Sequence, residues 1–291
     1  MDAKDFHLLA ALDENARQSL QALGRRVGLS APAVRDRIRR LEERGIIQGY
    51  WVSIDPAIFG RKDLLVNFGG EWSRADAAKA LEGPDVAWVA WKVDGGVTIQ
   101  VWPVEVPRAV AALSRFLGRE PRWRGVAQPG WTGALSGLDW RVLDALIDAP
   151  RDPIERLSAA TGLSEKTVRR HLEGLQKSEA IFVVPRLGFL QDAGELVYHL
   201  LVSGSAALPE VRRAIGDAVL IHETSDPPRR YLFCRADSLG DMTAKIHALE
   251  KIKGVTAAEV TLNREMLLGT QHVHELVRER IRETGTRRRA M

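Results

Sequence analysis

The chain has 291 residues, of which 45% are hydrophobic and 27% charged, a balance typical of folded domains rather than of disordered chains. No apolar run approaches the roughly 18 residues that a membrane-spanning helix needs, and Met1 is followed by a charged segment instead of a signal peptide. The single cysteine, Cys234, excludes an internal disulfide and a cysteine-based zinc site. We therefore expect a cytoplasmic protein with no membrane partner, and the net charge of +4 is compatible with a polyanionic one.

Apolar residues at helical spacing predict two short helices before residue 28 and a third after it. Gly28 suits the left-handed turn between helices, Ser30 suits the N-cap of the third helix, and Pro32 is tolerated in its first turn. The third helix turns one set of residues inward and another outward: Val34, Ile38 and Leu41 against Arg35, Asp36, Arg39, Arg40 and Glu43. This is the layout of a helix-turn-helix motif.

The second half of the chain repeats this pattern. A shift of 134 residues aligns the two halves without a gap for nearly forty residues. Leu9 then coincides with Leu143, and Gly28 with Gly162. Because apolar positions and the turn glycine agree together, we interpret the pattern as a duplication, joined by a glycine-containing linker over 129–137.

Each helix triplet is followed by a strand-like segment, at 47–54 and 181–187, and then by the order strand, helix, strand, strand, helix, strand. That order is the ferredoxin-like βαββαβ arrangement. The expected elements are 64–71, 74–81, 86–93, 97–104, 108–117 and 123–128 in the first half, and 196–204, 208–215, 218–224, 231–236, 239–251 and 257–263 in the second. A helix over 271–284 leads into a basic tail.

The first 60 residues resemble the Lrp/AsnC family of transcription regulators. The resemblance lies in the run Val27-Gly28-Leu29-Ser30, in Val34, and in the segment from Arg37 to Tyr50. It implies a winged helix-turn-helix followed by a ligand-sensing βαββαβ domain, the RAM domain. The fold class expected is α+β, with two winged helix-turn-helix domains and two ferredoxin-like, RAM-like domains. The domains expected are 1–49 (first winged helix), 50–130 (first RAM-like), 137–182 (second winged helix), 183–270 (second RAM-like) and 271–291 (C-terminal helix and basic tail).

The resemblance implies a sequence-specific regulator that binds double-stranded DNA through the recognition helix of the first winged helix. The second winged helix is either an additional DNA contact or a structural remnant of the duplication. The DNA-binding residues predicted are Ser30, Ala31, Pro32, Arg35, Asp36, Arg39 and Arg40 in the first, and Lys166, Thr167, Arg169 and Arg170 in the second. Residues 1–49 carry a net charge of +2, whereas residues 137–180 carry −1. Because lysine and arginine contacts to phosphate release counterions, we expect the first winged helix to bind more strongly.

Family members respond to amino-acid effectors near a Gly-Asp-type hairpin, so a small-molecule effector (an amino acid or other metabolite) is a possible partner. The corresponding hairpins here read Val93-Asp94-Gly95-Gly96-Val97 and Ser225-Asp226-Pro227-Pro228-Arg229, which also fit ordinary turns. Family members dimerise through RAM sheets, so we expect a homodimer or a pseudo-dimer within one chain. Apolar residues on both faces of the strand at 86–93 predict that the two βαββαβ units pack sheet against sheet.

No catalytic residue, cofactor or metal site is predicted. His272 and His274 are two residues apart on a helix and make a poor metal pair. An alternative is a tetrapyrrole enzyme resembling the siroheme decarboxylases, which use the same tandem modules, with His199 or His222 near the tetrapyrrole. A further alternative is an interaction protein whose sheets only oligomerise.

Overall fold

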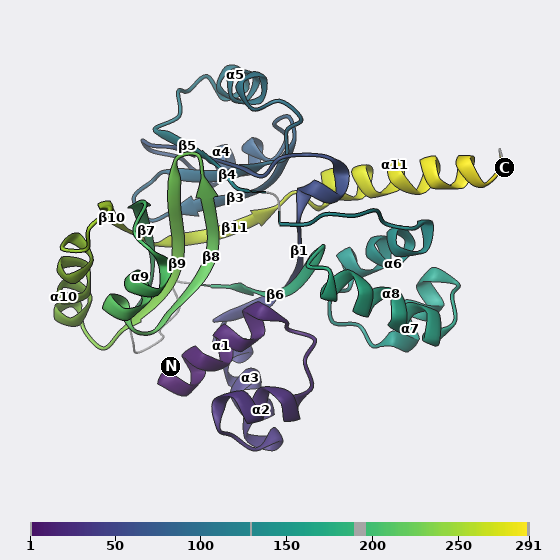
Figure 1. Cartoon of the computed structure of the whole chain (residues 1–291), viewed down its shortest axis with the longest axis horizontal. Coiled ribbons are helices and arrows are strands. Elements are labelled where there is room, and N and C mark those ends of the chain that lie inside the picture. The colour runs from purple at the N-terminus through teal and green to yellow at the C-terminus, as the bar shows by residue number, and fades with distance from the viewer. Residues whose placement is uncertain (1, 129, 189–195, 290–291) are drawn as a thin grey trace.

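The computed structural model describes residues 2–128, 130–188 and 196–289. Two helix triplets are present, and we call each one a head (Figure 1). The first head comprises α1 (Ala3–Glu14), α2 (Leu20–Val27) and α3 (Ala31–Glu43), and the second comprises α6 (Gly137–Asp148), α7 (Ile154–Thr161) and α8 (Glu165–Lys177). Parts of the expected linker (129), second RAM-like domain (189–195) and basic tail (290–291) lie outside the described residues.

The turn of each head follows from its glycine. Gly28 and Gly162 adopt φ values of 68° and 65°, the left-handed conformation that glycine accepts at no steric cost. Gly24 is required for a different reason, because a Cβ atom there would collide with the carbonyl oxygen of Leu29. The next helix then begins directly after a serine: as the N-cap, Ser30 accepts a hydrogen bond from the amide of Ala33 (3.3 Å).

The strand after each head does not fold back on its own head. Instead β1 (Ile47–Ile54) pairs with β6 (Ile181–Leu187) in an antiparallel two-stranded sheet. In this ladder Tyr50 faces Pro185 and Trp51 faces Val184. Under the 134-residue shift Val184 corresponds to Tyr50 and Pro185 to Trp51, so each residue faces the counterpart of its neighbour. The pairing is therefore reciprocal, as in an isologous dimer, and an approximate two-fold axis passes through the ladder.

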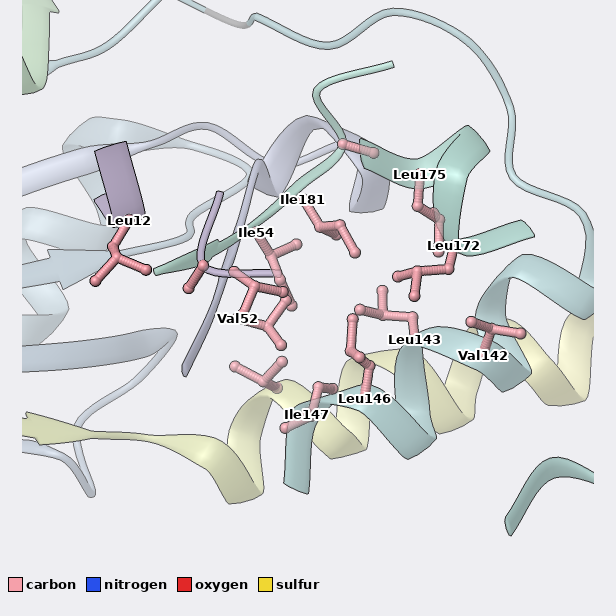
Figure 2. Close-up of a cluster of buried hydrophobic side chains, with 14 of the residues drawn as sticks. Leu12, Val52, Ile54, Val142, Leu143, Leu146, Ile147, Leu172, Leu175 and Ile181 are labelled. Atoms are coloured by element: carbon pink, nitrogen blue, oxygen red, sulfur yellow. The ribbon is translucent and has the colours of Figure 1, made fainter. Parts of the chain in front are cut away.

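The two heads share one hydrophobic core. In Figure 2, Leu12 of α1 and Val52 and Ile54 of β1 lie in the same cluster as residues of α6, α8 and β6. Helix α1 packs on β6, and the amide of Ala16 donates to the carbonyl of Val183 (2.6 Å) across the two halves. Because the side chains of both heads interdigitate, neither head can rotate without opening the core of the other.

Two larger sheets hold the βαββαβ units, as predicted. The first unit contains β2 (Leu64–Phe68), α4 (Arg74–Ala80), β3 (Val86–Lys92), β4 (Val97–Val101), α5 (Val106–Leu117) and β5 (Trp123–Val126). A short 3-10 helix, η1 (Pro56–Phe59), precedes it. The second unit contains β7 (Leu196–Gly204), α9 (Leu208–Ile215), β8 (Ala218–Ser225), β9 (Pro228–Ala236), α10 (Leu239–Glu250) and β10 (Val255–Thr261).

One strand is exchanged between the two units, which the sequence pattern did not predict. Strand β11 (Asn263–Leu268) follows the second unit but pairs with β3 at the edge of the first unit's sheet, whose order is β11-β3-β4-β2-β5. The second sheet has the order β10-β7-β9-β8. In the other direction, the described residues of the first unit reach the second sheet through an isolated bridge between Val126 and Asp226. The exchange therefore breaks the two-fold symmetry of the duplicated chain.

The faces of the two sheets that carry no helix lie against each other within one chain. This contact is more polar than the apolar strand patterns predict. The Asp63 carboxylate accepts a hydrogen bond from Gln100 (3.0 Å) and lies 2.8 Å from His222 of the other unit. Burial alone lowers the pKa of His222, but the Asp63 carboxylate outweighs it and raises this pKa. The prediction from β3 was incomplete because much of this face comes from β2 and β4, with Asn67, Thr98 and Gln100 buried there.

The C-terminal helix α11 (Thr270–Arg289) fixes the second head to the sheets. It leaves β11 at the edge of the first unit's sheet and packs along α6 (Figure 1). The imidazole of His274 lies between Asp144 (2.8 Å) and Asp148 (2.9 Å) of α6, with Arg278 4.0 Å from Asp144. Burial acts to lower the pKa of His274, but hydrogen bonds to the two carboxylates outweigh it and raise this pKa.

The docking of α11 should therefore weaken as the pH rises. Because the pKa of His274 is raised in the folded state, its stabilising effect is complete below the ordinary value of 6.5 and is lost above the raised one. We expect the melting temperature of wild type to be higher than that of His274→Gln. This difference should be roughly 2 °C larger at low pH than at high pH. The exposed His247, changed to glutamine, is the matched control. A difference that does not change with pH would contradict the assignment.

Candidate nucleic-acid interface

The predicted side chains of α3 lie on one solvent-facing side of the first head. Val34, Ile38 and Leu41 are buried beneath them, as expected from the helical spacing. Of the predicted residues, Ala31 is half-buried and the others are exposed: Ser30, Pro32, Arg35, Asp36, Arg39 and Arg40. The structure therefore brings the predicted set of the first head together on one helix, from its N-cap at Ser30 to Arg40.

Acidic neighbours neutralise part of this face. Arg39 lies 3.4 Å from Asp36 and 3.8 Å from Glu43, and the side chains of all three residues are more than half exposed. Exposed pairs of this kind contribute little to stability, so Arg39 can exchange its partner for a phosphate at small cost. No salt bridge involves Arg35 or Arg40 within the described parts of the chain.

A residue that the sequence analysis did not single out holds α3 in place. Arg37 turns inward and donates hydrogen bonds to Asp2 (2.8 Å) and Asp5 (2.6 Å) of the first helix. In the second head, His171 lies 2.6 Å from Asp139 at the equivalent two positions under the 134-residue shift. The sequence signal that could have indicated this contact is the presence of a basic and an acidic residue at the same two positions of both halves. Both heads thus fix the third helix of the triplet against the first.

The second head presents a weaker basic face. Lys166, Arg169 and Arg170 are exposed on α8, whereas Thr167 is half-buried and donates its amide to the N-cap Ser164 (3.2 Å). Arg170 is also engaged by His171 (3.1 Å). Two carboxylates share this surface, those of Glu165 and Glu173. The local field is therefore less favourable to a polyanion than that of α3.

A cavity of about 270 Å³ lies between the two βαββαβ units, away from both heads. Lys92, whose exposed fraction is only 6%, reaches it from the end of β3, and no carboxylate of the described residues lies within salt-bridge distance of its ammonium. Burial lowers the pKa of Lys92. Opposite it, Arg122 pairs with Glu259 of the other unit (3.3 Å). The sequence pattern did not indicate this site because a lysine at the end of a strand is usually exposed.

The two histidines considered for a tetrapyrrole, His199 and His222, already contact other side chains. His199 is buried and stacks on Tyr231, with ring centroids 4.8 Å apart. Its burial, with Lys92 nearby, lowers its pKa to about 3. Across residues 2–128, 130–188 and 196–289, no group of His, Cys, Asp and Glu side chains could hold a metal ion. Nor does any described helix have the length and apolar character needed to span a membrane.

Comparison with known proteins decides what the first head is. Residues 1–42 match the family model of the AsnC-type helix-turn-helix domain. The first head is an AsnC-type helix-turn-helix domain. Through it the chain is related to the Lrp/AsnC regulators. The transcriptional regulator Ptr1 of Methanocaldococcus jannaschii is 43% identical over 60 residues, which are 21% of this chain and 40% of Ptr1.

A longer match extends beyond the head. The leucine-responsive regulatory protein of Rhizobium meliloti is 33% identical over 100 residues, which are 33% of this chain and 64% of that protein. The chain therefore spans less than two thirds of the length of these relatives.

The tandem architecture has a relative among solved structures. The siroheme decarboxylase NirDL superposes over 95% of this chain and 97% of its own, with a TM-score of 0.51 and 12% sequence identity. At that identity the likeness concerns the fold alone. It shows that helix triplets and βαββαβ units also occur in tandem elsewhere.

Proposed function

We propose that this protein is a DNA-binding transcription regulator of the Lrp/AsnC type. The observation that carries the proposal is the exposed basic face of α3 on an AsnC-type helix-turn-helix domain. Arginine side chains on such a helix bind guanine edges in the major groove and backbone phosphates beside it. We assign these contacts to Arg35, Arg39 and Arg40. The rest of the surface against the duplex is formed by the N-cap Ser30 and by Ala31, Pro32 and Asp36.

Selection from a random pool of duplexes tests the proposal. The full-length protein should enrich a defined sequence and bind it with an affinity that falls steeply as salt rises, because counterions are released from each contacted phosphate. Equal binding of all duplexes, or no binding at low salt, would contradict a role as a sequence-specific regulator.

The second head should contribute less than the first. We expect Lys166→Ala, Arg169→Ala and Arg170→Ala together to weaken binding to the selected duplex by roughly tenfold, because Glu165 and Glu173 oppose the phosphates there. The loss for the corresponding triple change in α3 should be larger. Titration of both variants by fluorescence anisotropy at one salt concentration measures the order. A greater loss from the second set would reverse the ranking.

We further propose that the cavity beside Lys92 binds a small effector carrying a carboxylate and an amino group. The unpaired ammonium of Lys92 and the guanidinium of Arg122 suit the carboxylate, while Glu259 and Asp94 suit the amino group. The volume of about 270 Å³ lies near the lower limit of roughly 300–1,000 Å³ for sites that bind drug-sized molecules, and so fits a ligand the size of an amino acid.

A panel of free amino acids tests this site. A ligand that binds only the folded state at a hundred times its Kd stabilises that state by about 2.7 kcal/mol, so its melting temperature should rise. We expect such a rise for at least one amino acid with wild type and with the exposed control Lys251→Met, and none with Lys92→Met. A rise that survives Lys92→Met would place the ligand elsewhere.

The tetrapyrrole-enzyme alternative rests on the fold likeness to NirDL and makes a different prediction. A tetrapyrrole is larger than the ligands that the described cavity between the units suits. Titration of the purified protein with an iron tetrapyrrole, followed by absorption, separates the two functions. Under our proposal the spectrum is that of the free tetrapyrrole, and a stoichiometric spectral change would favour the enzyme.

A further inference from the structure

The two recognition helices present different side chains at equivalent exposed positions. Under the 134-residue shift Arg35 of α3 corresponds to Arg169 of α8, and this basic position is common to both. The other exposed positions differ in charge or in kind: Pro32 against Lys166, Asp36 against Arg170, Arg39 against Glu173, and Arg40 against Gly174. The duplication has therefore kept the scaffold of the heads and changed the surface.

These differences fall on the side chains that would face bases. Arginine and lysine select guanine through its two major-groove acceptors, whereas a glutamate or aspartate accepts from the amino group of cytosine and is repelled by phosphate. Two helices with opposite charges at the same two positions therefore select different base sequences. The pairs Asp36 against Arg170 and Arg39 against Glu173 are such a reversal.

The heads are nevertheless held in one fixed relation. The reciprocal register of β1 and β6 places an approximate two-fold axis between them, and their cores are continuous. The amides of Ala16 and Asp55 also donate to the carbonyls of Val183 and Ala180 across the two halves (2.6 and 3.1 Å). A homodimer with a two-fold axis must present the same helix twice and so favours a palindrome. One chain with two different helices has no such constraint.

We infer that a single chain binds a non-palindromic operator, whose two halves have different sequences and a fixed separation. This inference rests on the proposed DNA-binding function. The half bound by α3 contributes more affinity, and the half bound by α8 fixes the direction in which the protein lies on the duplex. Direction matters for a regulator because the two sides of the bound protein, including α11 beside the second head, are not equivalent.

The test is selection of bound duplexes by the full-length protein, followed by native mass spectrometry of the complex. We expect one motif with two unlike halves and one chain per duplex. Replacing the second half by an inverted copy of the first should weaken binding roughly tenfold or more, since each mismatched base pair is costly.

A symmetrised variant supplies the matched control. Lys166→Pro, Arg170→Asp, Glu173→Arg and Gly174→Arg give α8 the side chains of α3 at these positions, and a Cβ at Gly174 meets open space. This variant should select a palindrome built from the first half. A palindrome selected by wild type, a motif with only one defined half, or two chains per duplex would overturn the inference while leaving DNA binding intact. Failure to select any duplex would remove the proposed function as well.

Discussion

Replacement of Arg35, Arg39 and Arg40 by alanine should weaken binding to the selected duplex by roughly a hundredfold or more, because removing a single base or phosphate interaction costs about 1–3 kcal/mol. The logarithm of affinity should also fall less steeply with the logarithm of salt, by about 0.9 units per phosphate interaction removed. Fluorescence anisotropy across a salt series measures both quantities.

The same variant should keep its fold. All three side chains are exposed, and the ion pairs of Arg39 are surface pairs of small worth. Circular dichroism and melting temperature should therefore match wild type closely. Arg212 and Arg213 on α9 of the second βαββαβ unit are exposed arginines outside both heads, and their replacement by alanine is the control for loss of positive charge away from the heads. An unchanged affinity in the α3 variant would exclude α3 as the recognition helix.

Leu143→Ala should destabilise both heads, although Leu143 belongs only to the second. Its side chain is fully buried in the core that the heads share (Figure 2). Removal of a buried leucine side chain lowers the free energy of unfolding by about 2–5 kcal/mol. Hydrogen exchange should therefore show lower protection of α1 in the first head as well as of α6.

The control for this prediction is Leu113→Ala. Leu113 is also fully buried, but in the separate core of the first βαββαβ unit. This variant should be destabilised by a similar amount while the protection of α1 and α6 falls less. Equal protection of α1 in wild type and Leu143→Ala would show that the heads are independent.

The heads were predictable from sequence because their signals are local. The 134-residue repeat, the glycines at 28 and 162 and the spacing of buried residues on α3 define the helices without knowledge of distant contacts. The inward and outward faces of α3 followed from the same spacing. The order of strands and helices in both βαββαβ units was predicted on the same basis, with boundaries shifted by only a few residues at most ends.

The contacts between the two halves were not predictable in this way. Strand β11 has no alternation of buried and exposed residues, and its partner β3 lies far away in the sequence. The burial of Lys92 likewise depends on the other unit covering the end of its strand. The pairing of β1 with β6 makes the two-fold relation of the heads, and residues of both halves are required for it.

Genome-wide mapping of bound DNA in the cells that produce this protein decides whether the chain acts as a DNA-binding regulator. We expect discrete sites near promoters, each containing the same two-part motif in one orientation, and loss of these sites in the strain carrying alanine at Arg35, Arg39 and Arg40. The same pattern of bound DNA in wild type and in that variant, or no enrichment in either, would contradict the assignment of this chain as a DNA-binding regulator.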